Sequence, residues 1–249
     1  MLALERLTKH FGGVSAVQQV DLQVRTGDIV GLIGPNGSGK STMVNLITGV
    51  FAPTGGRVRW REREITGWPP HRVLAAGIGR TFQNIRLFGG LTVWQNLWVA
   101  QNAQSRRRGR LLSRWLAVDR ASMKHIEDTL DFCRLLDKRD ELARNLAFGE
   151  QRRLELARTL AAEPDLVLLD EPAAGMNAQE IGELRERILA LKQRGKTVVL
   201  IEHHMELVMG VAERVAVLNF GEKIAEGPPA AVQEHPRVRE AYLGTRRER

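Results

Sequence analysis

Residues 29–49 constrain the fold of this chain more than any other stretch. The apolar run Ile29–Ile33 predicts a short buried strand, and the pattern Lys40–Thr48 predicts a helix. Between them, Gly34–Ser41 has the spacing G-x-x-x-x-G-K-S. A strand, a glycine-rich loop and a helix in this order predict a site for a nucleoside triphosphate.

Each part of this loop has a physical role in holding phosphate. Gly34, Gly37 and Gly39 permit backbone conformations that other residues avoid, so successive N–H groups can point inward around a polyphosphate. The helix N-terminus adds unpaired N–H groups and a partial positive charge. Lys40 can reach the β- and γ-phosphates, and the Ser41 hydroxyl can ligate Mg²⁺. A purely structural turn is the alternative, and the complete pattern disfavours it.

Two acids follow a second apolar run, Leu166–Leu169. Such a run suits a central parallel strand covered on both faces, and ligands bind at the carboxyl ends of such strands. Asp170 can hold Mg²⁺ or its water shell together with Ser41, and Glu171 can polarise the attacking water as general base. A solvated acidic turn is the alternative. Because carboxylates are costly to bury unpaired, we expect a cation beside them.

The rest of the chain alternates between strand and helix patterns, which predicts an α/β fold with a mostly parallel, helix-covered sheet. The other expected strands are Leu2–Thr8, Val17–Arg25, Arg57–Arg63, a strand from Ile78 to Gln83, Thr197–Ile201, Arg214–Leu218 and Lys223–Glu226. The other expected helices are Pro69–Ala75 (one turn), Thr92–Ala103, Ala121–Leu136, Glu150–Ala162 and Ile181–Arg194.

Three further residues each have two possible roles. Phe11 precedes a glycine turn, where it can stack on a nucleotide base or belong to the core. Gln83 follows a strand, where its carbonyl can contact Mg²⁺ or water, or solvate a turn. His203 follows the strand Thr197–Ile201 and can donate to a γ-phosphate or be structural. The residues by themselves leave these alternatives open.

Composition narrows the class of protein only partly. The 249 residues include one cysteine, Cys133, so no internal disulfide can form, and no apolar stretch approaches the roughly 20 residues of a membrane span. The net charge of +8 suits nucleic acid or an anionic membrane surface and does not choose between them. The arginine-rich segment Gln104–Arg120 is expected to be a surface excursion.

Taken in order, these motifs resemble the ATP-binding cassette subunits of ABC transporters over essentially the whole chain. Gly34–Thr42 is similar to that family's Walker A motif, and Leu166–Asp170 with Glu171 to its Walker B motif and catalytic glutamate. The resemblance places Gln83 in the Q-loop, His203 as the switch histidine and Phe11 as the base-stacking aromatic. It implies ATP and Mg²⁺ as cofactors. The implied site comprises catalytic Glu171, His203, Gln83 and Lys40, nucleotide contacts from Phe11 and from Gly34, Pro35, Asn36, Gly37, Ser38, Gly39, Lys40, Ser41 and Thr42, and metal contacts from Ser41, Gln83 and Asp170.

The fold that the resemblance implies is a P-loop NTPase (RecA-like) core with a mostly parallel sheet. An antiparallel β subdomain and an α-helical subdomain, inserted at about residues 84–163, complete a single domain over residues 1–249.

The family's signature, Leu-Ser-Gly-Gly-Gln, is altered here to Leu146, Ala147, Phe148, Gly149 and Glu150. Ala147 lacks the hydroxyl that would donate to a nucleotide on the partner subunit, whereas backbone N–H groups at Gly149 and the following helix remain. The Glu150 carboxylate should weaken anion binding unless a neighbouring arginine offsets it.

Several stretches resemble the subunits of branched-chain amino acid importers, among them Arg80–Gln83, Arg86–Phe88, Glu171–Asn177 and Ala241–Gly244. The resemblance implies an ATPase that powers uptake of branched-chain or related small amino acids and amides. Its partners would be two membrane permease subunits, a second ATP-binding subunit and an extracytoplasmic solute-binding protein, with the chain peripheral on the cytoplasmic face of the inner membrane. We expect Arg106–Arg120 to face the membrane or permease, or to be a solvated loop.

Three other functions fit parts of the sequence. A cassette ATPase acting on nucleic acid or ribosomes would suit the basic charge, but such proteins usually hold two cassettes or a long coiled coil, and this chain has one phosphate loop and no sustained heptads. A phosphotransferase would need no signature motif. A nucleotide-sensing module would not need Lys40, Asp170 and Glu171 together. The sequence therefore favours a transport ATPase without nucleic acid.

Overall fold

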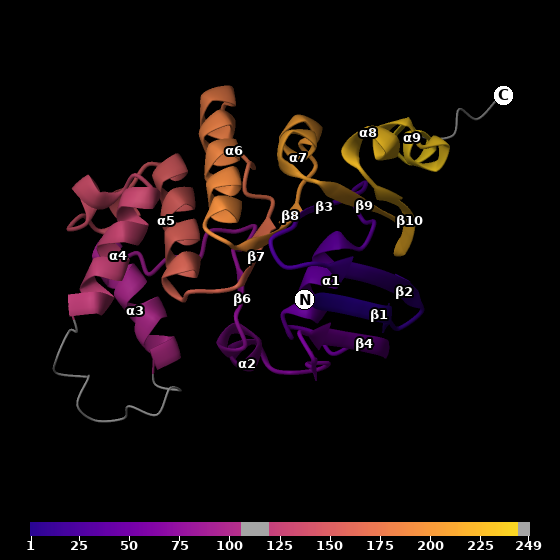
Figure 1. Ribbon diagram of the computed structural model, residues 1–249, viewed down its shortest axis with the longest axis horizontal. Helices are drawn as coiled ribbons and strands as arrows, with labels where there is room; N and C mark the ends of the chain where they lie inside the picture. Colours follow the sequence, from indigo (N-terminus) through magenta and orange to yellow (C-terminus); the bar gives the residue numbers. More distant parts are fainter. Residues whose placement is uncertain (106–119, 244–249) are drawn as a thin grey trace.

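The computed structural model describes residues 1–105 and 120–243, and its strands form two sheets (Figure 1). The larger sheet has the order β10-β9-β3-β8-β7-β6. Its strands are β3 (Ile29–Ile33), β6 (Ile78–Arg80), β7 (Leu166–Asp170), β8 (Thr197–Ile201), β9 (Arg214–Asn219) and β10 (Glu222–Gly227). The smaller sheet, β2-β1-β4-β5, contains β1 (Leu2–Phe11), β2 (Val14–Val24), β4 (Gly55–Trp60) and β5 (Arg63–Glu64).

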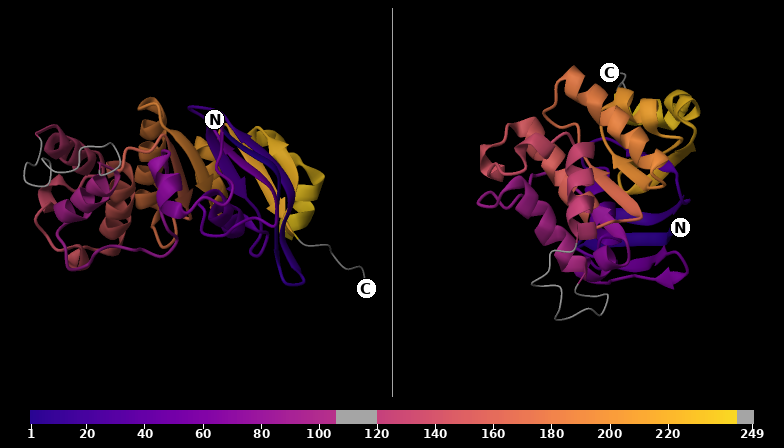
Figure 2. Two further views of the ribbon diagram at one scale, coloured as in Figure 1. Left: turned by 90° about the horizontal axis from the view of Figure 1, so that it is seen from below. Right: turned by 60° about the vertical axis from the view of Figure 1, so that its left-hand side comes forward.

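Helices cover the larger sheet and lie at both ends of the molecule (Figure 1). They are α1 (Lys40–Ile47), α2 (Pro70–Ala75), α3 (Val93–Ser105), α4 (Arg120–Phe132), α5 (Phe148–Ala161), α6 (Ala178–Gln193), α7 (Met205–Val211), α8 (Pro229–Glu234) and α9 (Pro236–Leu243), with short 3-10 turns η1 (Leu136–Lys138) and η2 (Ala143–Asn145). Figure 2 shows the larger sheet between helices α3–α5 on one side and the smaller sheet on the other. Helices α3–α5 fall within residues 84–163, for which we predict a helical subdomain.

The larger sheet is parallel from β6 to β9, and β10 pairs antiparallel with β9. Its apolar runs are buried on both faces. In β3, Ile29 and Ile33 pack into the core beneath the helices, whereas Val30 and Leu32 pack into the core shared with α1 and the smaller sheet. Alternate residues of a strand point to opposite faces, so both must be apolar when both faces are covered. The predicted α/β fold with an antiparallel β subdomain is confirmed.

The first two strands are longer than the sequence indicated. β1 reaches Phe11, which pairs with Val14 across the turn at Gly12 and Gly13, whereas we predicted an end at Thr8. Irregularities in the β1–β2 register, where Arg6 has a φ of 48°, interrupt the alternation of apolar residues. The pattern therefore concealed the outer half of this hairpin. The predicted strand Arg57–Arg63 is likewise two strands, β4 and β5, with a turn between them.

Other predicted boundaries shift for local reasons. Helix α6 begins at Ala178, before the predicted Ile181, because Asn177 and Glu180 cap each other's backbone N–H groups at 3.0 and 2.9 Å. Helix α4 ends at Phe132 rather than Leu136, and Arg134 has a left-handed φ of 53°. Strand β6 ends at Arg80, three residues before Gln83.

Two sequence-based expectations concern features beyond strand and helix limits. Residues 106–119, which make up most of the arginine-rich segment, lie outside the described residues, so its interpretation stays a prediction. Within residues 1–105 and 120–243, no helix is both long and apolar enough to span a bilayer.

The packing of α7 against β3 predicts the effect of adding a single methyl group. A Cβ atom at Gly31 would lie 2.6 Å from Cγ1 of Val208, so Gly31→Ala should destabilise the fold by about 1–3 kcal/mol through overpacking. Gly182→Ala, on the exposed face of α6, should instead stabilise it by about 0.5–1 kcal/mol. Urea unfolding of both variants measures this difference, and equal stabilities would contradict the packing.

Candidate nucleotide-binding site

A cavity of about 1010 Å³ lies where β3, β7 and β8 end. Its walls bring together most of the residues that the sequence singled out, namely Gly34, Pro35, Asn36, Gly37, Ser38, Gly39, Lys40, Ser41, Thr42, Gln83, Glu171 and His203. Val14, Ser15, Ala16, Gln18, Phe220 and Tyr242 complete the lining. Asp170 and Phe11 are absent from these walls.

The loop needs glycine at the positions that the sequence predicted. Gly34, Gly37 and Gly39 have φ values of 152°, 78° and 103°. A Cβ atom at Gly34 would lie 2.1 Å from the carbonyl oxygen of Leu218, and one at Gly39 would lie 2.4 Å from that of Ala16. The loop is thus packed against β2 and β9, and any side chain at these two positions would displace the backbone.

The Lys40 ammonium lies under the loop. It donates to the backbone oxygens of Gly34 at 2.7 Å and Pro35 at 3.0 Å, and the residue is only 6% exposed. Burial lowers its pKa, while the negative charges of Glu171 and Asp170 oppose that change. The Lys40 ammonium therefore lies within the electrostatic reach of both carboxylates.

The loop also contains a buried polar atom without a partner. Ser38 is 2% exposed, and its Oγ has no hydrogen bond among the described residues. Buried hydroxyls are rarely left unpaired. A phosphate oxygen held by the loop would supply an acceptor, and the N-terminus of α1 begins directly after Gly39. The loop therefore fits the phosphate chain of a nucleotide.

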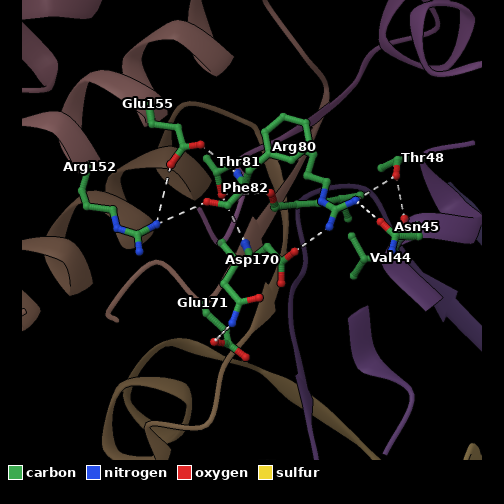
Figure 3. Close-up of polar contacts among 12 residues, drawn as sticks. Val44, Asn45, Thr48, Arg80, Thr81, Phe82, Arg152, Glu155, Asp170 and Glu171 are labelled. Carbon is green, nitrogen blue, oxygen red and sulfur yellow. Dashed lines mark hydrogen bonds and ion pairs between the residues drawn. The ribbon is translucent and has the colours of Figure 1, made fainter. Parts of the chain in front are cut away.

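The two acids at the carboxyl end of β7 have different environments. Asp170 is 2% exposed and accepts from Nη2 of Arg80 at 2.7 Å (Figure 3). Glu171 has a left-handed φ of 48°, which strains a non-glycine residue by about 1–3 kcal/mol, and its Oε2 accepts from Nε2 of Gln83 at 2.7 Å. The predicted cation beside the acids is therefore Arg80 together with Lys40. The prediction did not single out Arg80, although it named the motif containing it.

The oxygen donors around the cavity suit Mg²⁺. The Ser41 hydroxyl, the Gln83 amide and the carboxylates of Asp170 and Glu171 are hard ligands. No group of three or more His, Cys, Asp or Glu side chains that could hold a metal ion occurs in the described ranges. A cation here would therefore need the phosphates as further ligands, which is how Mg²⁺ is usually bound with nucleotides.

A buried carboxylate that we did not predict fixes the end of β8. Glu202 is 0% exposed and accepts from the backbone N–H groups of Ala173 at 2.8 Å, His203 at 2.9 Å and His204 at 3.2 Å. These bonds join the loop after Glu171 to the loop that carries His203, whose side chain is 59% exposed. In the sequence, the feature that could have indicated Glu202 is its place directly after the apolar strand Thr197–Ile201.

Comparisons with known proteins agree with this geometry. A family described as "ABC transporter" matches residues 17–174, which is more than half of the chain, and "Branched-chain amino acid ATP-binding cassette transporter" matches residues 222–248. The "High-affinity branched-chain amino acid transport ATP-binding protein LivG" of Salmonella typhimurium is 43% identical over 251 residues, with 98% of each chain covered. The chain belongs to the ATP-binding subunits of ABC transporters. It is of the branched-chain amino acid type and is an ATPase.

Solved structures support the fold of this ATP-binding subunit. The ADP conformation of an ATP-binding cassette of an ABC transporter superposes with a TM-score of 0.87 at 32% identity, over 98% of both chains. A dimeric bacterial ABC transporter cassette superposes with a TM-score of 0.79 at 26% identity, over 92% of this chain and 99% of the other.

Phe11 lies beside the nucleotide cavity of the subunit rather than in its wall. It is 42% exposed at the end of β1, its ring meets Phe51 edge-on at 5.3 Å, and the Lys9 ammonium lies 5.0 Å from the ring centre. Its role in stacking stays a prediction. Tyr242 of α9, which was not predicted, reaches the cavity lining from the C-terminal end.

The altered signature has a compensating charge. Glu150 lies in the first turn of α5, where Oε2 accepts from Ala147 N–H at 2.9 Å and Oε1 lies 2.6 Å from the Lys138 ammonium. Burial opposes ionisation of Glu150, but its bonds to Lys138 and Ala147 outweigh burial and lower its pKa. Arg153 lies 3.7 Å away and adds to the effect. The carboxylate that could repel a phosphate is thus paired, chiefly by a lysine rather than by the arginine we expected.

This pairing predicts a pH-dependent contribution to stability. Because folding lowers the pKa of Glu150, its stabilising effect is complete above the unfolded value, near 4.3, and is lost as the pH falls through the folded value. Lys138→Met should therefore lower the free energy of unfolding at pH 7 and have a shrinking effect as the pH falls below 4. Urea unfolding measures this, with Lys124→Met on exposed α4 as control. A pH-independent difference would contradict the pairing.

Proposed function

We propose that this ATPase drives import of branched-chain amino acids, or of related small amino acids and amides, across the inner membrane. The printed functions of its relatives support the solute class. The observation that carries the proposal is the convergence of Lys40, Gln83, Glu171 and His203 on one cavity with the glycine loop. Its partners are two permease subunits, an extracytoplasmic solute-binding protein and a second ATP-binding subunit, and it works at the cytoplasmic face of the membrane.

Within the cavity, each residue has a role that suits its position. Lys40, the loop N–H groups and the N-terminus of α1 bind the phosphates, and Phe11 stacks on the base. Mg²⁺, held by Ser41, Gln83 and Asp170, neutralises charge on the phosphates. Glu171 orients and deprotonates the attacking water, and His203 donates to the γ-phosphate. The bond from Gln83 to Glu171 supports this assignment, because it places the Q-loop beside the general base.

The nucleotide-binding site is completed by the signature of a second subunit. The solved dimer of a similar cassette supports this arrangement. Residues 1–249 act as one ATP-binding domain, in which the helices of residues 84–163 present Leu146, Ala147, Phe148, Gly149 and Glu150 to the partner's nucleotide. Because Ala147 has no hydroxyl donor, we infer that the composite site using this signature hydrolyses ATP more slowly than the site using Lys40 and Glu171.

Reconstitution tests the function and its chemistry together. ATP hydrolysis should rise when the cognate permease and an amino-acid-loaded binding protein are added, and it should not respond to nucleic acid. Glu171→Gln should reduce phosphate release by about 10²–10⁴-fold without preventing ATP binding, because the general base is lost while the amide oxygen can still accept from Gln83.

Glu186→Gln, on the exposed face of α6, is the matched control and should leave turnover unchanged. Stimulation by nucleic acid alone would overturn the transport function. Normal turnover in Glu171→Gln would leave transport standing and remove the assignment of the general base.

A further inference from the structure

Arg80 joins two elements of the site from behind the cavity. One guanidinium nitrogen, Nη2, donates to Oδ2 of Asp170 at 2.7 Å, and the other, Nη1, donates to Oδ1 of Asn45 at 2.6 Å and to Oγ1 of Thr48 at 3.2 Å (Figure 3). The side chains of Arg80 and Asp170 are 11% and 3% exposed. The forked guanidinium thus links the carboxyl end of β7 to the helix that follows the phosphate loop.

The elements that Arg80 joins carry both carboxylate and hydroxyl ligands proposed for Mg²⁺. Asn45 lies on α1 one helical turn after Ser41, so residues on this face of the helix move together. Asp170 is the last residue of β7. The bridge therefore restrains how far Asp170 can move from the helix that carries Ser41.

The strand end that carries Arg80 also holds the Asp170 backbone. Asp170 N–H donates to Oγ1 of Thr81 at 3.2 Å, and Thr81 N–H donates to the backbone oxygen of Leu168 at 3.0 Å. These bonds to its backbone and to Oδ2 restrain the orientation of the carboxylate. Its Oδ1 has no hydrogen bond in the described part of the chain.

We propose that Arg80 is a positioning residue that pre-organises Asp170 and Ser41 for the Mg²⁺ of the bound nucleotide. The inference deepens the proposed function and rests on the metal role given there to Ser41 and Asp170. Groups that orient metal ligands in this way typically contribute about 10–100-fold to metal affinity. Arginine suits the task because its planar fork places two separate nitrogens against acceptors on two elements, whereas a lysine has a single nitrogen.

The charge of Arg80 and its bridging bonds have opposite effects on the affinity for Mg²⁺. A guanidinium beside Asp170 repels Mg²⁺, so loss of the charge alone would strengthen Mg²⁺ binding. Loss of the bridge weakens it. Arg80→Lys keeps the charge and removes the fork, whereas Asn45→Ala keeps every charge and the pair with Asp170 but removes one anchor on α1.

The test measures the affinity of the full-length chain for a fluorescent, non-hydrolysable ATP analogue, with EDTA and across a Mg²⁺ titration. Arg80→Lys should reduce the Mg²⁺-dependent gain in affinity by about 10–100-fold and leave the affinity in EDTA unchanged. Arg80→Met should also reduce the gain, but by less, because it removes the repelling charge as well as the bridge. Asn45→Ala should give a smaller loss of the same sign. Arg61→Met is the matched control, because Arg61 pairs with Asp165 at 2.5 Å just before β7 but on the surface, and it should change neither affinity.

Arg80→Lys and Asn45→Ala keep the test available if Arg80→Met does not fold. Variants that lose thermal stability but keep the full Mg²⁺-dependent gain would overturn the positioning role, and so would a gain that increases in Arg80→Met. Asp170→Asn distinguishes the positioning role of Arg80 from the metal role of Asp170. If it removes the Mg²⁺-dependent gain and the Arg80 variants do not, only this inference fails; if it has no effect, the proposed metal role of Asp170 fails as well.

Discussion

The register of three parallel strands is the constraint on which the site depends. Leu32 of β3 lies opposite Ile201 of β8, and Ile201 lies opposite Asp170 of β7. The glycine loop, the Glu202–His203 turn and Glu171 consequently leave the sheet at one edge. A shift of a single residue in either pairing would turn every side chain of the shifted strand to the other face of the sheet and move the segment that follows it. The buried apolar residues of the strands therefore fix the chemistry without taking part in it.

Residues 80–83 connect that edge to the rest of the subunit, because together they bond to β7, α1, α5 and Glu171. Arg80 binds Asp170 and α1, Thr81 binds β7, and Gln83 binds Glu171. Between them, Phe82 donates its N–H to Glu155 of α5 at 3.0 Å and accepts from Arg152 at 3.3 Å (Figure 3). Burial raises the pKa of Glu155 despite these contacts. Since α5 begins at the signature, one short segment links the cavity of this chain to its own signature.

Much of this arrangement could be predicted, because local patterns encode it. Ile29–Ile33 and Thr197–Ile201 have the predicted limits, and the glycines of the loop have the positive φ angles expected of them. What the sequence concealed depends on tertiary contacts. Bulges hid the end of β1 near Phe11, and the bridging role of Arg80 arises only when β6 lies beside β7. Lys138 reaches Glu150 across eleven intervening positions that no periodicity connects.

The central claim is that the glycine-lined cavity holds Mg-ATP between Lys40 and the acids at the carboxyl end of β7. A crystal structure of the Glu171→Gln variant with ATP and Mg²⁺ tests it most directly. The account predicts that the Lys40 ammonium contacts the β- and γ-phosphates, with Mg²⁺ close to Ser41 and Asp170 and the Arg80 bridge intact. A nucleotide bound elsewhere, with Lys40 still on the oxygens of Gly34 and Pro35, would contradict the account.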